Sequence, residues 1–356
     1  MRPRLACTLA TLAVALCMPS AAHAAALDGD GMWIWQKGRS TGGSVTRIVA
    51  KAKRHGVETV IVKAAHGRRP WRQFSRPLVT RLHRSGLKVC AYQRIIGLRP
   101  RAEAGTAARA KRLGADCLVV DAESEYEGRY AGAQVYIRRL RARVGPTYEV
   151  ALTSFPYVHY HPRFPYSVFL GPGGAQANIP QMYWKDIGVS VDRIFKVTWT
   201  HNKVYGRPIY PLGQTYLNPS PRQIKRFRQL ALVYGAGGVS WWAWEHSRGR
   251  HWRALGAPLS LAALPRRRDR WPMLRRGSRS DLVAWAQQHL MRLGLLRVVN
   301  GRFGSGTRRA VRTFQTRNGL VPSGRVDAVT WPRLLAAGPA AVRWRGRSAR
   351  PLVPRR

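Results

Sequence analysis

The chain has 356 residues, and its 62 Lys and Arg against 16 Asp and Glu give a formal net charge of +46 at pH 7. This length accommodates one large domain and a small one, and four cysteines exclude a small scaffold held by disulfides. The positive charge favours polyanionic partners. Because nearly all of the excess is Arg, a bias in nucleotide composition explains it equally well.

Residues 1–24 have the pattern of a secretory signal peptide. Met1–Arg4 is short and basic, the apolar run that follows ends at Met18, and Ala22-His23-Ala24 fits a small-x-small cleavage site. The apolar run is too short to cross a bilayer, and no later segment reaches transmembrane length. We therefore expect an exported chain, secreted or at the cell envelope, whose polyanionic partners are envelope polymers and not nucleic acid.

Cleavage after about Ala24 leaves two cysteines, Cys90 and Cys117. Both lie in expected strands, so we expect them to be small, buried, apolar side chains. A disulfide between them is the alternative, which export permits.

Residues 28–256 alternate short apolar strands with basic, amphipathic stretches. The expected strands are 32–36, 59–65, 88–95, 117–121, 149–154, 179–184, 208–214 and 238–245. The expected helices are 44–55, 76–85, 102–113, 130–144, 190–202, 221–235 and 248–255, with a long loop over 156–177. Eight strand–helix units predict an α/β fold, a (β/α)8 barrel. A doubly wound sheet is the alternative, but residues 36–43 lack its glycine-rich phosphate loop.

Three segments follow the barrel. Residues 257–270 form a basic, proline-containing linker, 271–337 a small all-α domain of three helices, and 338–356 a basic tail that we expect to be disordered. In the small domain, Val283, Ala286, Leu290 and Leu293 make one apolar helix face.

The order of short motifs in this small domain carries a family resemblance. They are Asp281-Leu282, Asn300-Gly301-Arg302-Phe303, Asn318-Gly319-Leu320 and Thr330-Trp331. Together they resemble the three-helix peptidoglycan-binding domain of bacterial wall hydrolases. The resemblance implies binding of peptidoglycan or another wall polysaccharide, with Asn300, Arg302, Arg308 and Asn318 as exposed candidates.

Two carboxylates stand at the end of the fourth expected strand of the barrel. Asp121 and Glu123 are two residues apart, so they point to the same face of the strand, at the end where barrels of this kind hold their active sites. Close carboxyl groups raise each other's pKa, so one holds a proton while the other is ionised. Glycosidic cleavage uses such a pair.

Asp-x-Glu at this position resembles the family 25 glycoside hydrolases, lysozymes that cut the glycan of peptidoglycan. The resemblance covers about residues 30–250 and implies that Glu123 is the general acid and Asp121 its partner. The Asp usual in the first strand of that family is replaced by Trp33, which puts activity in question. A chitinase-like barrel is the near alternative, although only the last Asp-x-Glu of its longer motif is present.

Other residues at the expected strand ends are candidates for the same site. Glu245 ends the eighth strand and would orient water or substrate, with an ion pair to an arginine as the alternative. Aromatic rings would stack on sugars, and amides would bond hydroxyl or acetamido groups. The substrate-binding candidates are Trp35, Lys63, Tyr92, Gln93, Gln181, Tyr183, Trp184, Gln214 and Trp242. Alternation turns about half of any strand toward the helices, so we expect several of these to be core.

These patterns predict a secreted glycoside hydrolase that cleaves wall glycan by carboxylate acid catalysis. The alternatives are a catalytically inactive barrel that binds the cell wall, and a chitinase-like hydrolase of N-acetylated glycans. No cofactor is implied, and no metal site is expected, because His66 has no Cys, Asp or His at ligand spacing.

Overall fold

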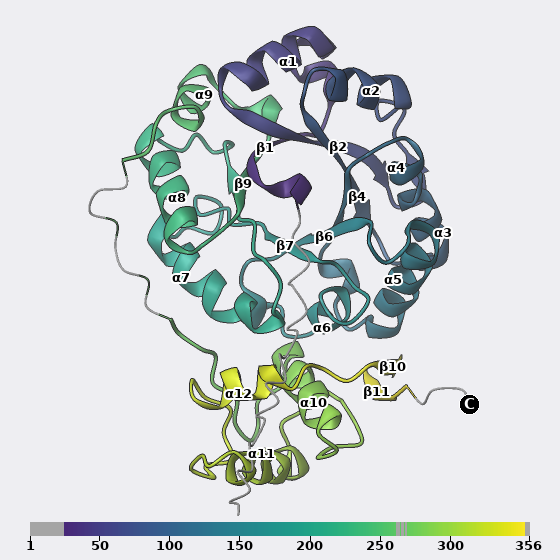
Figure 1. Ribbon diagram of the computed structural model, residues 1–356, viewed down its shortest axis with the longest axis vertical. Helices are drawn as coiled ribbons and strands as arrows, with labels where there is room; N and C mark the ends of the chain where they lie inside the picture. Colours follow the sequence, from purple (N-terminus) through teal and green to yellow (C-terminus); the bar gives the residue numbers. More distant parts are fainter. Residues whose placement is uncertain (1–24, 261–263, 265–266, 268, 353–356) are drawn as a thin grey trace, which may run out of the picture.

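The computed structural model describes residues 25–260, 264, 267 and 269–352. The expected signal peptide lies outside the described residues, as does part of the expected linker. A barrel and a smaller domain make up the chain, the smaller one lying beside α6 (Figure 1).

Eight parallel strands form the barrel wall. They are β1 (Gly29–Ile34), β2 (Val57–His66), β4 (Lys88–Ile95), β5 (Cys117–Ala122), β6 (Glu149–Ser154), β7 (Ala177–Pro180), β8 (Leu212–Gln214) and β9 (Gly238–Trp242). Their order is β7-β6-β5-β4-β2-β1-β9-β8, and isolated parallel bridges from Asn178 to Ile209 and from Gln181 to Leu212 join the two ends. A short strand, β3 (Arg69–Pro70), pairs antiparallel with the end of β2. The predicted α/β barrel is confirmed.

Helices surround this wall (Figure 1). They are α1 (Val45–Arg54), α2 (Arg76–Arg84), α3 (Pro100–Ala107), α4 (Arg109–Arg112), α5 (Tyr130–Val144), α6 (Tyr166–Phe169), α7 (Val191–Asn202), α8 (Pro221–Val233) and α9 (Gly249–Leu255). Serine caps begin several of them: the Ser44, Ser75, Ser190 and Ser220 side chains each accept a bond from a backbone N–H three residues on. The short helix α6 lies inside the segment expected to be a loop.

The barrel interior is a separate apolar core made by the inward faces of the strands. It includes Trp33, Ile61, Tyr92, Val119 and Leu212. The short 3-10 helix η1 (Ala25–Leu27) belongs to this core through Ala26 and Leu27. The Ala26 N–H donates to the carboxylate of Glu149, where β6 begins, so η1 closes the amino-terminal end of the barrel.

Cys90 and Cys117 also point into this interior and are joined by a disulfide. The expectation of two free, buried thiols is wrong. The two residues face each other directly in the β4–β5 register, with their Cα atoms 4.6 Å apart, a separation that a disulfide spans readily.

The smaller domain has three helices, α10 (Asp281–Arg292), α11 (Ser305–Arg317) and α12 (Thr330–Ala336). Two buried amides organise its loops. Gln287 accepts from the Asn300 and Gly301 N–H groups and donates to the Thr307 hydroxyl. Gln315 plays the equivalent part in the next loop, accepting from the Gly324 N–H and donating to Thr330.

Residues 342–351, within the tail that was expected to be disordered, form regular structure. Strands β10 (Val342–Arg345) and β11 (Ser348–Pro351) form an antiparallel hairpin that packs on α5. Trp344 is buried and stacks on Tyr130, with ring centroids 4.3 Å apart. Gln134 on α5 donates to the Val342 carbonyl and accepts from the Trp344 N–H, so it pairs with the hairpin like a neighbouring strand.

The barrel and the smaller domain share a buried polar contact. Asp281, the first residue of α10, is fully buried, and its carboxylate accepts from the Ser167 N–H and hydroxyl and from the Tyr205 hydroxyl. Nearby, the Trp285 indole donates to the Val204 carbonyl at 2.6 Å. These bonds fix the smaller domain against the barrel side that carries α6.

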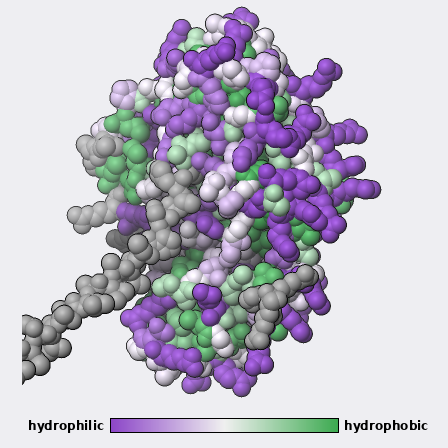
Figure 2. Space-filling view, turned by 45° about the vertical axis from the view of Figure 1, so that its right-hand side comes forward, coloured by the Kyte–Doolittle hydropathy of each residue, from purple (hydrophilic) through white to green (hydrophobic). Residues whose placement is uncertain are grey.

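Hydrophilic side chains are spread over the face shown in Figure 2, with hydrophobic patches between them. Among the described residues, no helix combines the length and apolar character needed to span a membrane.

Candidate functional site

The two predicted carboxylates lie together where β5 leaves the barrel. Asp121 is the fifth residue of β5, and its inward direction follows from Cys117 and Val119, which belong to the interior core. Glu123 follows the strand directly. The Asp121 side chain is 13% exposed and that of Glu123 is 30% exposed, so Asp121 lies deeper in the barrel mouth.

Arg94, near the end of β4, holds these carboxylates, and the sequence analysis missed it. Its Nη1 atom lies 2.6 Å from Glu123 Oε1 and 3.5 Å from Asp121 Oδ1, and its Nη2 atom lies 2.7 Å from Glu125 Oε2. Strand pairing places Arg94 directly beside Asp121. One guanidinium therefore contacts three carboxylates at the mouth.

The charges of this cluster shift the pKa of its members. Burial, and to a smaller extent the charge of Glu123, raise the pKa of Asp121 from 3.8 to about 7 against the opposing effect of Arg94 and Lys63. The Asp121 and Glu123 carboxyl groups share two neighbours, because Arg94 and Gln181 each contact both of them. Burial lowers the pKa of Lys63 to about 8, against the attraction of Asp121. The raised pKa allows Asp121 to hold a proton up to near neutral pH.

Gln181, just beyond β7, completes the polar cluster. Its Nε2 donates to Glu123 Oε1 at 3.1 Å and lies 3.4 Å from Asp121 Oδ1. Tyr183 stands near the same carboxylates, which contribute with burial to raise its pKa, and it packs edge-on against Tyr216 at 5.4 Å. The structure thus brings both residues to the two carboxylates.

Aromatic side chains and Lys63 form the floor below this cluster. The Tyr92 ring lies 4.8 Å from Trp33 and 5.8 Å from Trp242, and Lys63 Nζ lies 4.6 Å from its centroid. Trp33, which occupies the place of the family's first-strand Asp, donates from its indole to Ser240. The position that lacks the carboxylate is therefore filled by an apolar side chain.

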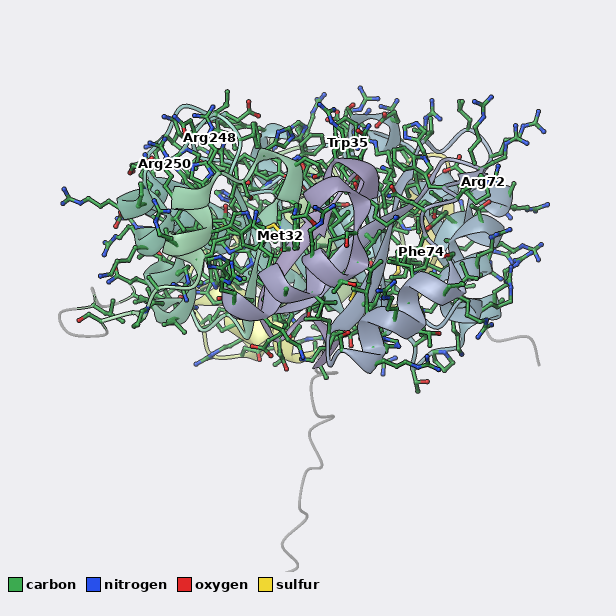
Figure 3. All side chains as sticks on the ribbon, turned by 90° about the horizontal axis from the view of Figure 1, so that it is seen from above. Met32, Trp35, Arg72, Phe74, Arg248 and Arg250 are labelled. Carbon is green, nitrogen blue, oxygen red and sulfur yellow. A yellow bond between two sulfur atoms is a disulfide. The ribbon has the colours of Figure 1, made fainter. Side chains whose placement is uncertain are left out.

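Trp35 lies at the rim of the barrel. In Figure 3 it lies along the same edge of the barrel as Arg248, with Met32 deeper inside. Trp35 is half-buried, and its carbonyl accepts from Gln73. It is placed to border the mouth.

Glu245 serves the loop after β1. Its Oε1 atom accepts from the Gln36 N–H at 2.5 Å and from the Ser40 hydroxyl at 3.2 Å. Among the described residues it takes part in no ion pair, so the predicted alternative of an arginine partner is wrong. Glu245 orders the loop that borders the mouth.

Two predicted substrate-binding residues face away from the mouth, and a third is engaged in loop contacts. Gln93 donates to the Gly67 and Glu103 carbonyls and accepts from the Tyr136 hydroxyl, all on the helix side of the wall. Trp184 is fully buried against Phe227. Gln214 accepts from the Lys185 N–H and donates to the Tyr216 carbonyl, so it holds two loops.

The histidines show no sign of a metal centre. Within the described parts of the chain, no group of three or more His, Cys, Asp and Glu side chains is placed to hold an ion. His161 pairs instead with Glu127 and stacks on Phe155.

The barrel matches solved structures of glycan-acting enzymes. One is the Bacillus cereus spore cortex-lytic enzyme SleL, with 12% identity and a TM-score of 0.51, covering 65% of this chain and 75% of that one. Another is a class V chitinase from Pseudomonas fluorescens Pf-5, with 11% identity and a TM-score of 0.50, covering 64% and 98%. At these identities the likeness establishes the fold alone, a parallel (β/α)8 barrel.

The smaller domain is identified from its sequence. Residues 279–334 match the family described as putative peptidoglycan binding domain, which confirms the prediction made from their motifs. No curated protein matches the chain in sequence.

Proposed function

We propose that the chain is an exported glycoside hydrolase that cleaves the glycan of peptidoglycan, with Glu123 as the general acid. The observation that carries the proposal is the Asp121–Glu123 pair, which shares contacts with Arg94 and Gln181 at the carboxyl ends of the barrel strands. A peptidoglycan-binding domain on the same chain supports the choice of substrate.

The contacts of Arg94 bear on the mechanism. Its Nη1 atom lies 2.6 Å from Glu123 Oε1 and 3.5 Å from Asp121 Oδ1, so the two carboxyl groups are close together. Inverting enzymes separate their two carboxyl groups by about 6.5–9.5 Å to leave room for a water molecule. We therefore propose that Asp121 is a partner of Glu123 and that the substrate's own acetamido oxygen attacks the anomeric carbon.

In this scheme Glu123 gives its proton to the glycosidic oxygen as the bond to the anomeric carbon breaks. The acetamido oxygen forms the new bond to that carbon, and water later opens the cyclic intermediate with Glu123 as the base. Asp121, whose pKa burial raises to about 7, is the proton store beside Glu123. Gln181 and Tyr183 lie where they would hold the acetamido group.

A second candidate, a wall-binding protein without turnover, is favoured by Arg94. Its contact with Glu123 at 2.6 Å must break before that carboxylate takes up a proton as an acid. Substrate entry would have to displace Arg94 toward Glu125, which it already contacts.

Release of reducing ends from purified peptidoglycan by the mature chain tests the proposal. Glu123→Gln is expected to lower release at least ~100-fold, the usual scale for loss of a general acid. Glu58→Gln, the same change at an exposed residue at the amino-terminal end of β2, is expected to match the wild type. Equal release by Glu123→Gln would exclude the acid role, whereas wall binding without release by the wild type would establish the second candidate.

A further inference from the structure

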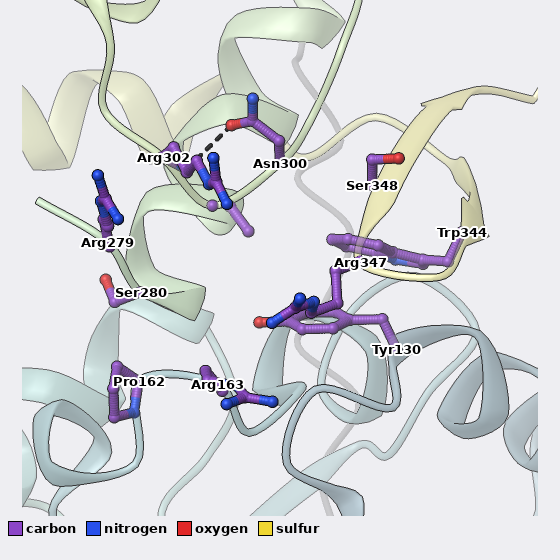
Figure 4. Close-up of a pocket in the computed structure, with 12 residues that line it drawn as sticks. Tyr130, Pro162, Arg163, Arg279, Ser280, Asn300, Arg302, Trp344, Arg347 and Ser348 are labelled. Atoms are coloured by element: carbon purple, nitrogen blue, oxygen red, sulfur yellow. Dashed lines mark hydrogen bonds between the residues drawn. The ribbon is translucent and has the colours of Figure 1, made fainter.

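A cavity of about 480 Å³ lies where the barrel, the smaller domain and the C-terminal hairpin meet (Figure 4). The barrel contributes the start of α5 and the loop before α6. The smaller domain contributes the residues before α10 and the loop between α10 and α11. The residues used below are Tyr130, Arg163, Arg279, Asn300, Arg302, Trp344 and Arg347.

Four arginines converge on this cavity from separate parts of the chain. They are Arg163 in the barrel loop, Arg279 and Arg302 in the smaller domain, and Arg347 at the hairpin turn. All four side chains are exposed, and within the described residues none of them pairs with a carboxylate at ion-pair distance. The residues that line the cavity in the described part of the chain include no Asp or Glu.

Asp281, which follows the lining residue Ser280, forms no ion pair with these arginines among the described residues. It is fully buried, and its oxygens accept hydrogen bonds from Ser167 and Tyr205. Four like charges around one small cavity repel one another, and an anion that entered would relieve this repulsion and gain charge-assisted hydrogen bonds.

The cavity is preformed because its walls are fixed to each other. The Asp281 contacts join the smaller domain to the barrel, and the Trp344–Tyr130 stack joins the hairpin to α5. The Asn300 side chain accepts from the Arg302 N–H at 2.9 Å and so shapes the loop at its upper edge (Figure 4). Binding here would cost little ordering of the backbone.

We propose that this interdomain cavity binds a carboxylate of the peptidoglycan stem peptide. The planar guanidinium groups match a carboxylate by paired hydrogen bonds. The choice of peptide carboxylate over another anion rests on the proposed function and on the matched peptidoglycan-binding domain. The site requires all three parts of the chain, so the barrel and the hairpin take part in wall binding alongside the small domain.

The test measures binding of a fluorescent disaccharide–tetrapeptide fragment of peptidoglycan to the mature chain by anisotropy. The Glu123→Gln background is used so that turnover does not change the probe. Replacement of both Arg302 and Arg347 by Ala is expected to raise the Kd at least about tenfold. Arg54→Ala with Arg84→Ala, two exposed arginines at the ends of α1 and α2, removes the same charge far from the cavity and is expected to leave the Kd within about twofold.

A second probe, the same fragment with its carboxylates converted to methyl esters, is expected to bind weakly and equally to both double variants. Equal weakening by the two arginine pairs would show a general charge effect and overturn the proposal. Binding of a glycerol-phosphate oligomer in preference to the fragment would overturn the choice of carboxylate. Hydrolysis is measured separately, by comparing the wild type with Glu123→Gln. The cavity proposal can therefore fail while the hydrolase assignment stands, and the hydrolase assignment can fail while the cavity proposal stands.

Discussion

Replacement of Asp121 by Asn is expected to make the protein more stable above neutral pH. Burial raises the pKa of Asp121 from 3.8 to about 7, so between these values the folded protein binds the proton more tightly than the unfolded chain does. Stability therefore falls as the pH rises through this window, and the whole loss is present above about pH 7. Asn carries no charge at any pH and avoids this loss.

The pKa difference sets the size of the effect. Three pH units correspond to ~4 kcal/mol in the free energy of unfolding, and since Asp121 is almost fully buried, solvent screens little of it. We expect Asp121→Asn to exceed the wild type by about 2–4 kcal/mol at pH 8 and to match it near pH 4.

Urea unfolding followed by tryptophan fluorescence at pH 4, 6 and 8 measures this difference. Asp192→Asn is the matched control, because Asp192 is 56% exposed on α7 and pairs at the surface with Arg226. A difference between Asp121→Asn and wild type that stays constant from pH 4 to pH 8 would refute the charge reasoning. If Asp121→Asn were less stable than the wild type at pH 8, the attraction of Lys63 and Arg94 for the Asp121 carboxylate would outweigh the cost of burying its charge.

Two further predictions concern stability outside the mouth. Replacing Cys90 and Cys117 by Ala is expected to lower the free energy of unfolding by about 3 kcal/mol, from the 27-residue separation that the disulfide closes, and a reductant should then affect only the wild type. Trp344→Ala removes the ring stacked on Tyr130 and is expected to release the hairpin. Trypsin should then cut after Arg345 and Arg347 at least about tenfold faster than in the wild type, whereas Trp344→Phe should stay protected. Unchanged cleavage of Trp344→Ala would mean that the Gln134 bonds alone hold the hairpin.

Strand positions were predictable where apolar runs are bounded by turn residues. The predicted strands 88–95 and 149–154 agree with β4 and β6 at both ends. The seventh prediction failed partly: residues 208–214 were expected, but β8 begins at Leu212. An apolar run does not show where ladder pairing starts, because the neighbouring strands decide that.

The paired carboxylates were predictable because they depend only on local spacing, and the same spacing rule explains two of the misses. Tyr92 and Gln93 are adjacent, so they cannot both face the interior. With Tyr92 inward, the next inward residue is Arg94, whose role follows from its register beside Asp121. The same error was made with the adjacent residues Tyr183 and Trp184. Both were predicted to bind substrate, but Trp184 packs among the helices. Strict use of this alternation would have placed Arg94, and not Gln93, among the predicted site residues.

The C-terminal hairpin could not be predicted from its own residues, because the surface that stabilises it belongs to another part of the chain. Residues 338–356 are rich in Arg and Pro and hold few apolar side chains, so considered alone they cannot offset the entropy of ordering. In the structure, the missing apolar surface is on α5: Trp344 covers Tyr130, and Gln134 supplies the hydrogen bonds of an absent strand. The same contact brings Arg347 to Arg163 and Arg302 around one cavity. A tail that contributed only charge would need no such buried anchor, so its fixed position argues for a specific anionic ligand at the domain junction.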